Sequence, residues 1–364
     1  MKLFSCPHCR NRIYFENASC LFCGHQVLYL PLQRRFALPG RHGPFFCRNA
    51  SECGCNWAAE EEGRFCRACQ LNSTIPDLSV PANRERWAKL EEAKRHLVDQ
   101  LLALGLDVRA KSHLDDEVGI AFDFLNDPPA DHGPRIMTGH EHGLITLNAG
   151  EADPLHREEM RIKMGESYRT LLGHFRHEIG HYYWDRLVRD DAHWLERSRA
   201  AFGDERADYM AALQANYEQG PPADWQERHI SPYASAHPWE DFAETWAHYL
   251  HISDTLEMAR ALKLEPEALD AGVPLVVEGQ GEPGAADTMP DAATDEARES
   301  FDGRFDGMLA DWLAVSEATN ALNRCMGLPD VYPFVIAPKT AGKLRFVHEL
   351  LKAKKRKSVL PVAA

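Results

Sequence analysis

Apolar residues recur every three or four positions along several stretches of the chain, which predicts amphipathic helices there. The first helix is expected between Asn83, a residue that suits a helix start, and Gly105, which suits a helix end. Further helices are predicted over residues 156–187, over 189–217 as one or two helices, and over 305–327. Cys325, in the last of these, is expected to be a small buried residue.

Between the first two helices the apolar positions alternate, which predicts short strands. These strands are residues 118–125 (VGIAFDFL) and 143–148 (GLITLN), with the histidine-rich segment GHEHG between them. Residues 143–148 are interpreted either as an exposed sheet edge, to which an extended peptide could pair, or as an ordinary strand packed beneath a helix. His140 and His142 are expected to lie on the surface.

The composition is that of a globular protein with room for two or three domains, since 44% of the 364 residues are hydrophobic and 26% are charged. No apolar run approaches the length of a membrane-spanning helix, and no apolar signal segment opens the chain. We therefore expect a cytoplasmic protein without membrane contact. The formal net charge of −14 opposes general binding to nucleic acid.

The cysteines mark a domain boundary, because nine of the ten precede residue 70. A Pro- and Ser-bearing stretch follows, and a later stretch rich in Gly, Ala, Pro and Asp lacks apolar periodicity over most of its length. The predicted organisation is a zinc-binding region (1–70), a connector (71–83), a main domain (84–269), a flexible loop (270–299) and a C-terminal helical part of the main domain (300–364).

Two C-x-x-C pairs open the cysteine-rich region. Cys6 with Cys9 and Cys20 with Cys23 supply four thiolates at the spacing of a structural zinc site. A second set offers five candidates for four places: Cys47, Cys53, Cys55, Cys66 and Cys69. A disulfide framework would need an oxidising compartment, and a redox pair would need a thioredoxin-like context that the sequence does not indicate.

The candidate catalytic chemistry is carried by His177-Glu178-Ile179-Gly180-His181. On a helix, residues four apart lie on one face, so His177 and His181 can bind one metal ion. Glu178 can then reach a water molecule on that ion and act as a base. The alternative is an amphipathic helix whose polar face is merely solvated.

A catalytic zinc ion usually has three protein ligands and one water, so the motif needs a third ligand. Glu240 and Glu244 lie four apart in a segment whose apolar residues predict another helix. Glu240 could complete the metal site, and Glu244 could accept a hydrogen bond from a liganding histidine. The longer zinc motif, with a glycine and a third histidine downstream, is absent because Trp184 and Leu187 occupy those positions.

These motifs resemble known metallopeptidases. The HEIGH segment, followed by Tyr233 and by Glu240–Glu244, resembles the gluzincins, and most of all the branch that includes anthrax lethal factor. The whole chain, from MKLFSCPHC to DVYPFVIAPKTAGKLRFVH, resembles the bacterial zinc-binding metallopeptidases with an N-terminal zinc-ribbon region.

The resemblance implies roles for individual residues. It implies His177, His181 and Glu240 as ligands of a catalytic zinc ion, Glu178 as the base and Tyr233 as a donor to the transition state. It also implies a second structural zinc site that leaves Cys53 spare and consists of Cys47, Cys55, Cys66 and Cys69.

We therefore expect an α+β protein: a zinc-ribbon region followed by a mostly helical, zincin-like domain with a small sheet. Its expected function is that of a zinc metallopeptidase with one catalytic and two structural zinc ions, acting on a peptide or protein substrate. The alternative from another class is a non-catalytic scaffold that binds a protein partner through its zinc ribbons. The intact Glu178 favours the enzyme, because a purely structural site has no use for a base.

Overall fold

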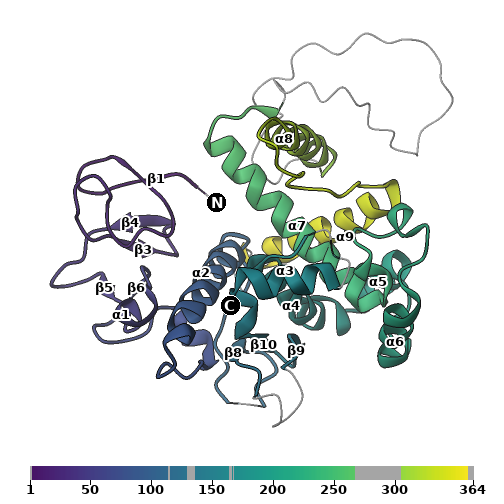
Figure 1. Ribbon diagram of the computed structural model, residues 1–364, viewed down its shortest axis with the longest axis horizontal. Helices are drawn as coiled ribbons and strands as arrows, with labels where there is room; N and C mark the ends of the chain where they lie inside the picture. Colours follow the sequence, from purple (N-terminus) through teal and green to yellow (C-terminus); the bar gives the residue numbers. More distant parts are fainter. Residues whose placement is uncertain are drawn as a thin grey trace. The chain divides into compact units, whose positions relative to one another are not determined.

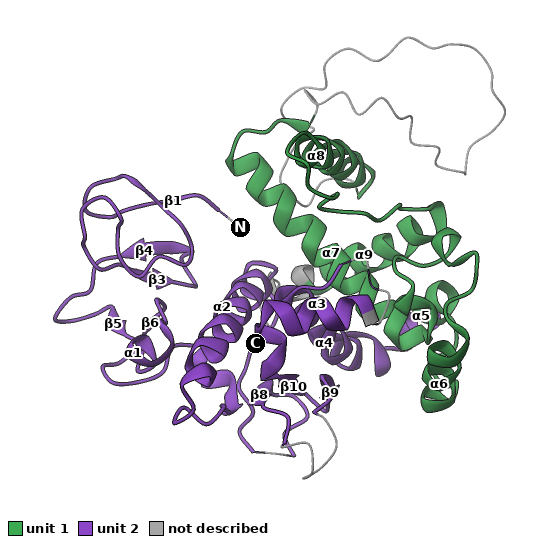
Figure 2. Ribbon diagram, viewed as in Figure 1, with its two compact units in different colours: residues 1, 197–354 green, residues 2–196, 355–364 purple. Residues whose placement is uncertain are grey.

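The computed structural model of the chain describes residues 2–113, 115–128, 136–163, 166, 168–266 and 305–359. The fold is α+β, as the sequence predicts. It consists of two compact units, one of residues 2–196 with the end of the last helix, and one of residues 197–354 (Figure 2). The predicted flexible loop, 270–299, lies outside the described residues. Within the described part, no helix has both the length and the apolar composition to cross a bilayer.

The N-terminal region of the unit of residues 2–196, which is unit 2 in Figure 2, contains three two-stranded antiparallel sheets. Strand β1 (Phe4–Ser5) pairs with β2 (Arg12–Ile13), β3 (Leu28–Leu30) with β4 (Arg35–Ala37), and β5 (Phe45–Phe46) with β6 (Ala58–Ala59). The short helix α1 (Ala50–Cys53) and the 3-10 turn η1 (Cys69–Leu71) lie in the same region. A buried cluster of aromatic rings forms the core beneath the sheets and consists of Phe4, Phe15, Tyr29, Phe36 and Trp57.

Helix α2 (Pro81–Ala103) binds this region through a buried polar contact. The Tyr29 hydroxyl donates a 2.6 Å hydrogen bond to the carboxylate of Asp99 on the helix. The Arg34 guanidinium lies 3.1 Å from the same carboxylate. A buried charge is stable only when it is paired in this way, so the two contacts fix the region on α2.

The ends of α2 differ in part from the prediction. The helix begins at Pro81, because proline needs no hydrogen-bond partner for its nitrogen in the first turn. Asn83 therefore does not cap the helix, and its side-chain amide donates instead to the carbonyl of Asp77 at 2.9 Å. Gly105 follows the C-terminus with a φ of 74°, the left-handed conformation expected for a glycine at this position.

The main sheet has four strands in the order β7-β8-β10-β9. Strands β7 (Asn72–Thr74), β8 (Ala121–Leu125) and β10 (Leu144–Asn148) run parallel, and β9 (Gly139–Glu141) is antiparallel to β10. Residues 72–74 of the predicted connector are thus not irregular, because β7 pairs with β8. Of the two interpretations of residues 143–148, the exposed sheet edge is wrong, because β10 lies between β8 and β9, and the outer strands of this sheet are β7 and β9.

Helices α2 and α4 cover one face of this sheet (Figure 1). Phe122 and Phe124 alternate along β8 and therefore point to the same side. Their ring centroids lie 5.5 and 6.1 Å from that of Phe175 on α4. From α2, the Lys94 ammonium lies 5.6 and 5.5 Å from the same two rings. The sheet and both helices therefore share one core.

The long helix predicted over 156–187 is two helices. After the 3-10 turn η2 (Ala149–Ala152), α3 spans Pro154–Lys163 and α4 spans Leu171–Trp184, followed by a π-helical turn, η3 (Asp185–Arg189). Thr170 has an extended backbone, and its hydroxyl accepts a hydrogen bond from the Gly173 amide at 3.0 Å. A side chain at Gly173 would place its Cβ only 3.0 Å from this hydroxyl. The cap at Thr170 starts a new helix within the apolar repeat.

The unit of residues 197–354, which is unit 1 in Figure 2, is mainly helical in its described residues. It contains the end of α5 (Ala192–Phe202), then α6 (Tyr209–Gln219), η4 (Trp225–Glu227), η5 (Tyr233–Ser235), α7 (Pro238–Ala261), α8 (Phe305–Cys325) and α9 (Pro338–Val359). The rings of Phe202, Phe242 and Phe346 form a buried edge-to-face cluster between α5, α7 and α9. Helix α7 therefore occupies the centre of this unit.

Cys325 does not lie in the core. It is the last residue of α8 and is exposed, whereas the sequence analysis predicts a buried residue. The buried residues of α8 stop at Val315, so the final turns of the helix extend into solvent.

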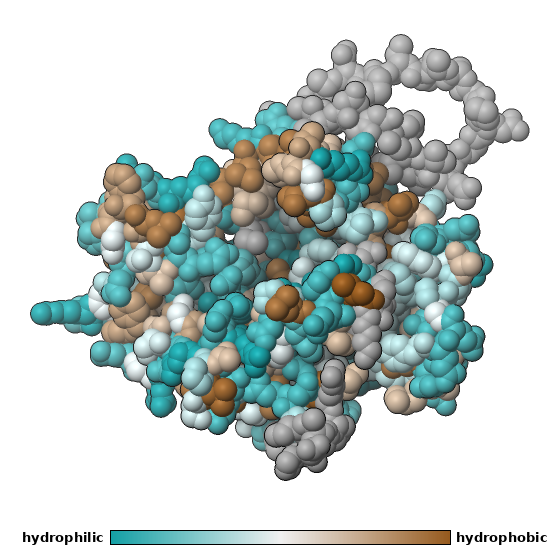
Figure 3. All heavy atoms as spheres, in the orientation of Figure 1, coloured by the Kyte–Doolittle hydropathy of each residue, from teal (hydrophilic) through white to brown (hydrophobic). Residues whose placement is uncertain are grey.

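The face in Figure 3 is mostly hydrophilic and its apolar residues form small, scattered groups, as expected for a surface in contact with water.

Candidate metal centres

The first candidate centre lies between the two C-x-x-C pairs. The structure brings Cys6, Cys9, Cys20 and Cys23 together, with one sulfur of each within 4.8 Å of the others. The Cys6–Cys23 and Cys9–Cys20 sulfur distances are 3.7 and 3.6 Å. A disulfide would need about 2.05 Å. Four sulfurs around one zinc ion, with bonds of about 2.3 Å in a tetrahedron, lie roughly 3.8 Å apart, so this geometry suits zinc.

The second candidate centre uses four of the five remaining N-terminal cysteines. Cys47, Cys55, Cys66 and Cys69 form a fully buried group, and the Cys55 sulfur lies 3.6 Å from that of Cys66 and 3.7 Å from that of Cys69. Cys53 is not a member of this group. It is the last residue of α1, and its sulfur lies 3.5 Å from the carbonyl oxygen of Asn49. The structure thus groups the same four cysteines that the resemblance implies.

Buried charges on α2 surround the second centre. The carboxylate of Glu91 lies 3.6 Å from the Cys69 sulfur and accepts hydrogen bonds from Asn72, Trp87 and Lys94 at 2.7, 3.2 and 2.8 Å. Burial raises the pKa of Glu91 above its ordinary value, although the Lys94 ammonium opposes this. The carboxylate therefore joins the cysteine group, strand β7 and helix α2.

Arg95 is the second buried charge beside this centre. Burial alone would lower its pKa, but the negative groups around it, chiefly Cys55 and Glu91, raise the pKa above its ordinary value. Four thiolates on one zinc ion carry a net charge of −2, so a buried guanidinium is an appropriate neighbour. The sequence analysis did not identify Glu91 or Arg95. The sequence feature that could have identified them is the occurrence of charged residues on the face of a helix that is buried.

The third candidate centre lies on α4. The Nε2 atoms of His177 and His181 are 3.2 Å apart, and their rings are nearly perpendicular. Two nitrogens on one tetrahedral zinc ion, with bonds of 2.0–2.1 Å, would lie about 3.3 Å apart. Glu178 belongs to the same helix and is only 8% exposed. The helix thus places two candidate nitrogen donors and a buried carboxylate as the motif requires.

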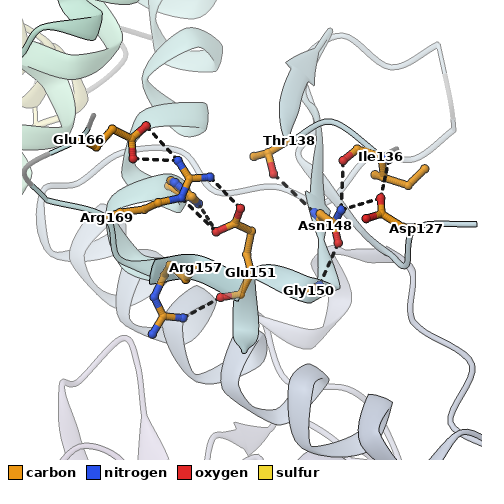
Figure 4. Close-up of polar contacts among 10 residues, drawn as sticks. Asp127, Ile136, Thr138, Asn148, Gly150, Glu151, Arg157, Glu166 and Arg169 are labelled. Atoms are coloured by element: carbon orange, nitrogen blue, oxygen red, sulfur yellow. Dashed lines mark hydrogen bonds and ion pairs between the residues drawn. The ribbon is translucent and has the colours of Figure 1, made fainter. Parts of the chain in front are cut away.

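A charged network lies at the start of α4 (Figure 4). The Arg169 guanidinium donates to Glu151 at 2.7 Å and to Glu166 at 2.8 and 2.9 Å. His174, one turn before His177, has its Nδ1 3.7 Å from the Glu151 carboxylate. Burial works against ionisation of Glu151, but Arg169 more than compensates and leaves its pKa below the ordinary value. The network therefore fixes the end of α4 that precedes the histidine pair.

The outer strand β9 places a third histidine beside this pair. The ring centroid of His140 lies 6.3 Å from that of His181, and the rings are nearly parallel. The backbone amide of Gly143 donates to His140 Nε2 at 2.9 Å. Burial, together with the neighbouring His181, lowers the pKa of His140 to about 3. His142 is exposed as predicted, whereas His140 is partly buried and keeps a neutral ring, which the sequence analysis missed.

In the other unit, Glu240 lies in the first turn of α7 and is 1% exposed. The Tyr209 hydroxyl donates a 2.7 Å hydrogen bond to Glu240 Oε1. One turn later, Glu244 Oε2 accepts a 2.6 Å hydrogen bond from the Ser231 hydroxyl. Both acidic residues of the predicted pair on α7 are therefore held by hydrogen bonds, Glu240 by Tyr209 and Glu244 by Ser231. The sequence analysis identified neither Tyr209 nor Ser231.

The segment before α7 contains Tyr233, which is partly buried in η5, and this segment is anchored at two points. At the first, the Ser231 hydroxyl accepts a hydrogen bond from the Ala234 amide at 3.1 Å. At the second, His229 Nδ1 lies 3.1 Å from the Asp241 carboxylate, which also accepts a hydrogen bond from Lys343. The backbone around Tyr233 is thus tied to α7 and α9.

Two four-cysteine groups and a helical histidine pair define a zinc-binding protein. Residues 83–350 match the family described as "Putative zinc-binding metallo-peptidase", and residues 3–80 match a zinc-ribbon domain family. The first match covers more than half of the chain, so the chain belongs to this zinc-binding metallopeptidase family. The expected family, with a zinc-ribbon region at the N-terminus, is therefore confirmed.

The chain is also similar to proteins of two mycobacteria. Uncharacterized proteins of Mycobacterium tuberculosis and Mycobacterium bovis are each 37% identical to it over 354 residues. The similarity covers 96% of this chain and 95% of each relative, so the zinc-ribbon region and the rest of the chain occur together in all of them. No solved structure matches the chain significantly.

Proposed function

We propose that the protein is a zinc-dependent metallopeptidase of the gluzincin type. The observation that carries the proposal is the 3.2 Å distance between the Nε2 atoms of His177 and His181 on a helix that also bears the buried Glu178. This is the arrangement that hydrolysis by an activated water requires. The membership of the zinc-binding metallopeptidase family supports the same reaction class.

In this proposal Glu240 is the third protein ligand. It is a buried carboxylate at the start of α7, and its Oε1 already accepts a hydrogen bond from Tyr209. Ligating carboxylates are commonly held by such a second hydrogen bond, which fixes their orientation. Glu244 would play the corresponding part for a liganding histidine, and its own carboxylate is held by Ser231.

A zinc ion held by His177, His181 and Glu240 would lower the pKa of a bound water and polarise the peptide carbonyl. Glu178 accepts a proton from the attacking water and delivers it to the nitrogen of the leaving amine. The Tyr233 hydroxyl donates a hydrogen bond to the carbonyl oxygen as it gains negative charge. The contacts that anchor η5 serve to keep this hydroxyl in place.

The substrate would be a peptide or protein segment in an extended conformation. Strand β9 is one of the two outer strands of the main sheet and carries His140 close to His181. The outer edge of β9 pairs with no other described strand, so an extended segment could pair with it and run past the histidine pair. The sheet edge that pairs with a peptide is thus assigned to β9 and not to residues 143–148, because β10 is an internal strand.

The test uses the zinc-loaded protein and a Glu178→Gln variant. Both are incubated with a mixed peptide library, products are identified by mass spectrometry, and zinc is counted on the same samples. We expect the parent to cleave, and the variant to keep its zinc and lose turnover. The matched control is Glu159→Gln, an exposed carboxylate on α3, which should cleave like the parent.

Two results would contradict the proposal. If the parent and the Glu159→Gln control, both fully loaded with zinc, cleave no peptide in the library, the protein is a zinc-binding scaffold. If the Glu178→Gln variant cleaves as fast as the parent, hydrolysis does not depend on this motif.

A further inference from the structure

Two exposed histidines lie beside the first four-cysteine group. His8 lies between Cys6 and Cys9, and His25 follows Cys23 by two residues. Their rings are stacked, with centroids 3.7 Å apart and planes 16° from parallel. Both side chains are exposed to solvent. The two metal-binding loops, which are far apart in sequence, thus present an imidazole pair at one point of the surface.

The backbone sets which nitrogen of His25 is available. Its Nδ1 lies 3.3 Å from the carbonyl oxygen of Cys23, a partner that can only accept a hydrogen bond. The neutral ring therefore carries its proton on Nδ1 and has its lone pair on Nε2. This is the usual way in which a protein orients a histidine that binds a metal ion through the other nitrogen.

A third donor lies beside the imidazole pair. One nitrogen of His8, one nitrogen of His25 and the Cys23 sulfur all lie within 4.8 Å of one another. Donors on one tetrahedral zinc ion lie roughly 3.3–3.8 Å apart, and each imidazole must point its in-plane lone pair at the ion, so the two exposed rings would rotate out of their stacked arrangement when they bind it. Two imidazoles and a thiolate are a ligand set that suits zinc and similar borderline ions.

Electrostatics favour a second cation at this place. A zinc ion with four thiolates carries a net charge of −2. The second cysteine group has the buried Arg95 beside it. In the first group, the sulfur contacts that we observe are with other thiols and with the neutral side chain of Asn11. An added divalent ion would therefore reduce this negative charge.

We propose that His8, His25 and the thiolate of Cys23 bind a second divalent ion of the zinc type, next to the structural zinc of the first cysteine group. Cys23 is shared by the two ions, and water completes the outer site. The outer ion is exposed and has one shared ligand, so it binds more weakly than the inner one. The inner zinc then has an adjacent exchange position at the surface, whereas the second group is fully buried.

The test compares the full-length parent with the double variant His8→Gln/His25→Gln. Each is dialysed against zinc buffers at picomolar and at micromolar free zinc, and bound zinc is counted by mass spectrometry. Both proteins should hold the same number of ions at picomolar free zinc. At micromolar free zinc the parent should hold one more ion than the variant. A double variant at two other exposed histidines, His42→Gln/His193→Gln, should behave like the parent.

Equal zinc counts for the parent and the His8/His25 variant at micromolar free zinc would overturn the proposal. A second measurement needs no variant: the parent is loaded with ¹¹³Cd and titrated with more cadmium while its NMR spectrum is recorded. We expect a new resonance and a shift of one existing four-thiolate resonance, because Cys23 is shared. A titration that moves no four-thiolate resonance would show that the thiolate is not shared and would also overturn the proposal. Neither measurement depends on peptidase activity.

Discussion

The hydroxyl of Tyr209 donates a 2.7 Å hydrogen bond to Glu240 Oε1, which links α6 to the first turn of α7. If Glu240 is a zinc ligand, Tyr209 fixes its carboxylate in the orientation that the metal needs. Such supporting contacts are typically worth about 10–100-fold in metal affinity. Tyr209→Phe should therefore weaken zinc binding at the catalytic centre by roughly that factor, measured by competition with a chelator.

Tyr217 supplies the control for this prediction. It lies on the same helix, α6, and is 56% exposed. Tyr217→Phe should leave all zinc affinities unchanged. If Tyr209→Phe also leaves them unchanged, its hydroxyl serves only the packing of α6 against α7.

Glu91 should be essential for stability. Its buried carboxylate is paired with the buried ammonium of Lys94, and both side chains are fully buried. Removal of one partner from a buried ion pair leaves an uncompensated charge and costs about 3–5 kcal/mol. We expect Glu91→Ala to lower the free energy of unfolding by about this amount in urea titrations of the zinc-loaded protein. The neighbouring Glu92→Ala, at an exposed position, should have almost no effect, and a loss of similar size there would argue against this assignment.

Asp116 should make the stability depend on pH. Its carboxylate accepts hydrogen bonds from Arg109, from Ser112 and from the amides of Val118 and Gly119. Chiefly because of Arg109, the pKa of Asp116 lies well below its ordinary value. The folded state therefore binds this proton less readily than the unfolded state. The stabilisation is complete above about pH 4 and declines as the pH falls towards the lowered pKa.

Two variants test this pH dependence by thermal unfolding. Asp116→Asn should have a lower Tm than the parent at pH 7, and the difference should shrink between pH 4 and pH 2. Asp115→Asn, at the exposed neighbouring position, should follow the parent throughout. A constant difference between Asp116→Asn and the parent over this range would mean that the carboxylate charge is not the cause.

Zinc should hold the N-terminal region together. The aromatic core of this region lies between short strands of two or three residues, which have little stability of their own. A structural zinc ion contributes about 10–16 kcal/mol to small modules of this kind. Cys6→Ser should therefore bind one zinc ion fewer and lose near-ultraviolet circular dichroism from the Tyr29 and Trp57 rings. Cys325→Ser removes an exposed thiol and should change neither quantity, and equal results for the two variants would refute the role of Cys6.

The sequence predicted the features that depend on spacing alone. The members of each C-x-x-C pair, and of the His177–His181 pair, are only three or four residues apart. The local backbone therefore brings their side chains together without contacts from distant segments. Helix α7 was also predicted with Glu240 and Glu244 on it, since both its apolar repeat and its length are clear.

Features that depend on a single capping residue or on tertiary pairing were not predicted. Thr170 interrupts an apolar repeat that would suit one long helix, and only its hydrogen bond to Gly173 shows the break. Strand β10 became internal because β9 folds back onto it, which no alternation pattern indicates. From the sequence alone, charged residues such as Glu91 are expected to be exposed to solvent. Their burial depends on hydrogen-bond partners from other segments, which the sequence does not indicate.

Strand β7 begins three residues after Cys69 and pairs in parallel with β8. Its first residue, Asn72, also donates to the carboxylate of Glu91, which in turn contacts the Cys69 sulfur. The ribbon and the sheet of the main domain are thus not separable pieces of the molecule. A truncation that starts after the ribbon would strip the sheet of an outer strand, and a cell short of zinc would produce chains in which the main sheet itself is left unfinished.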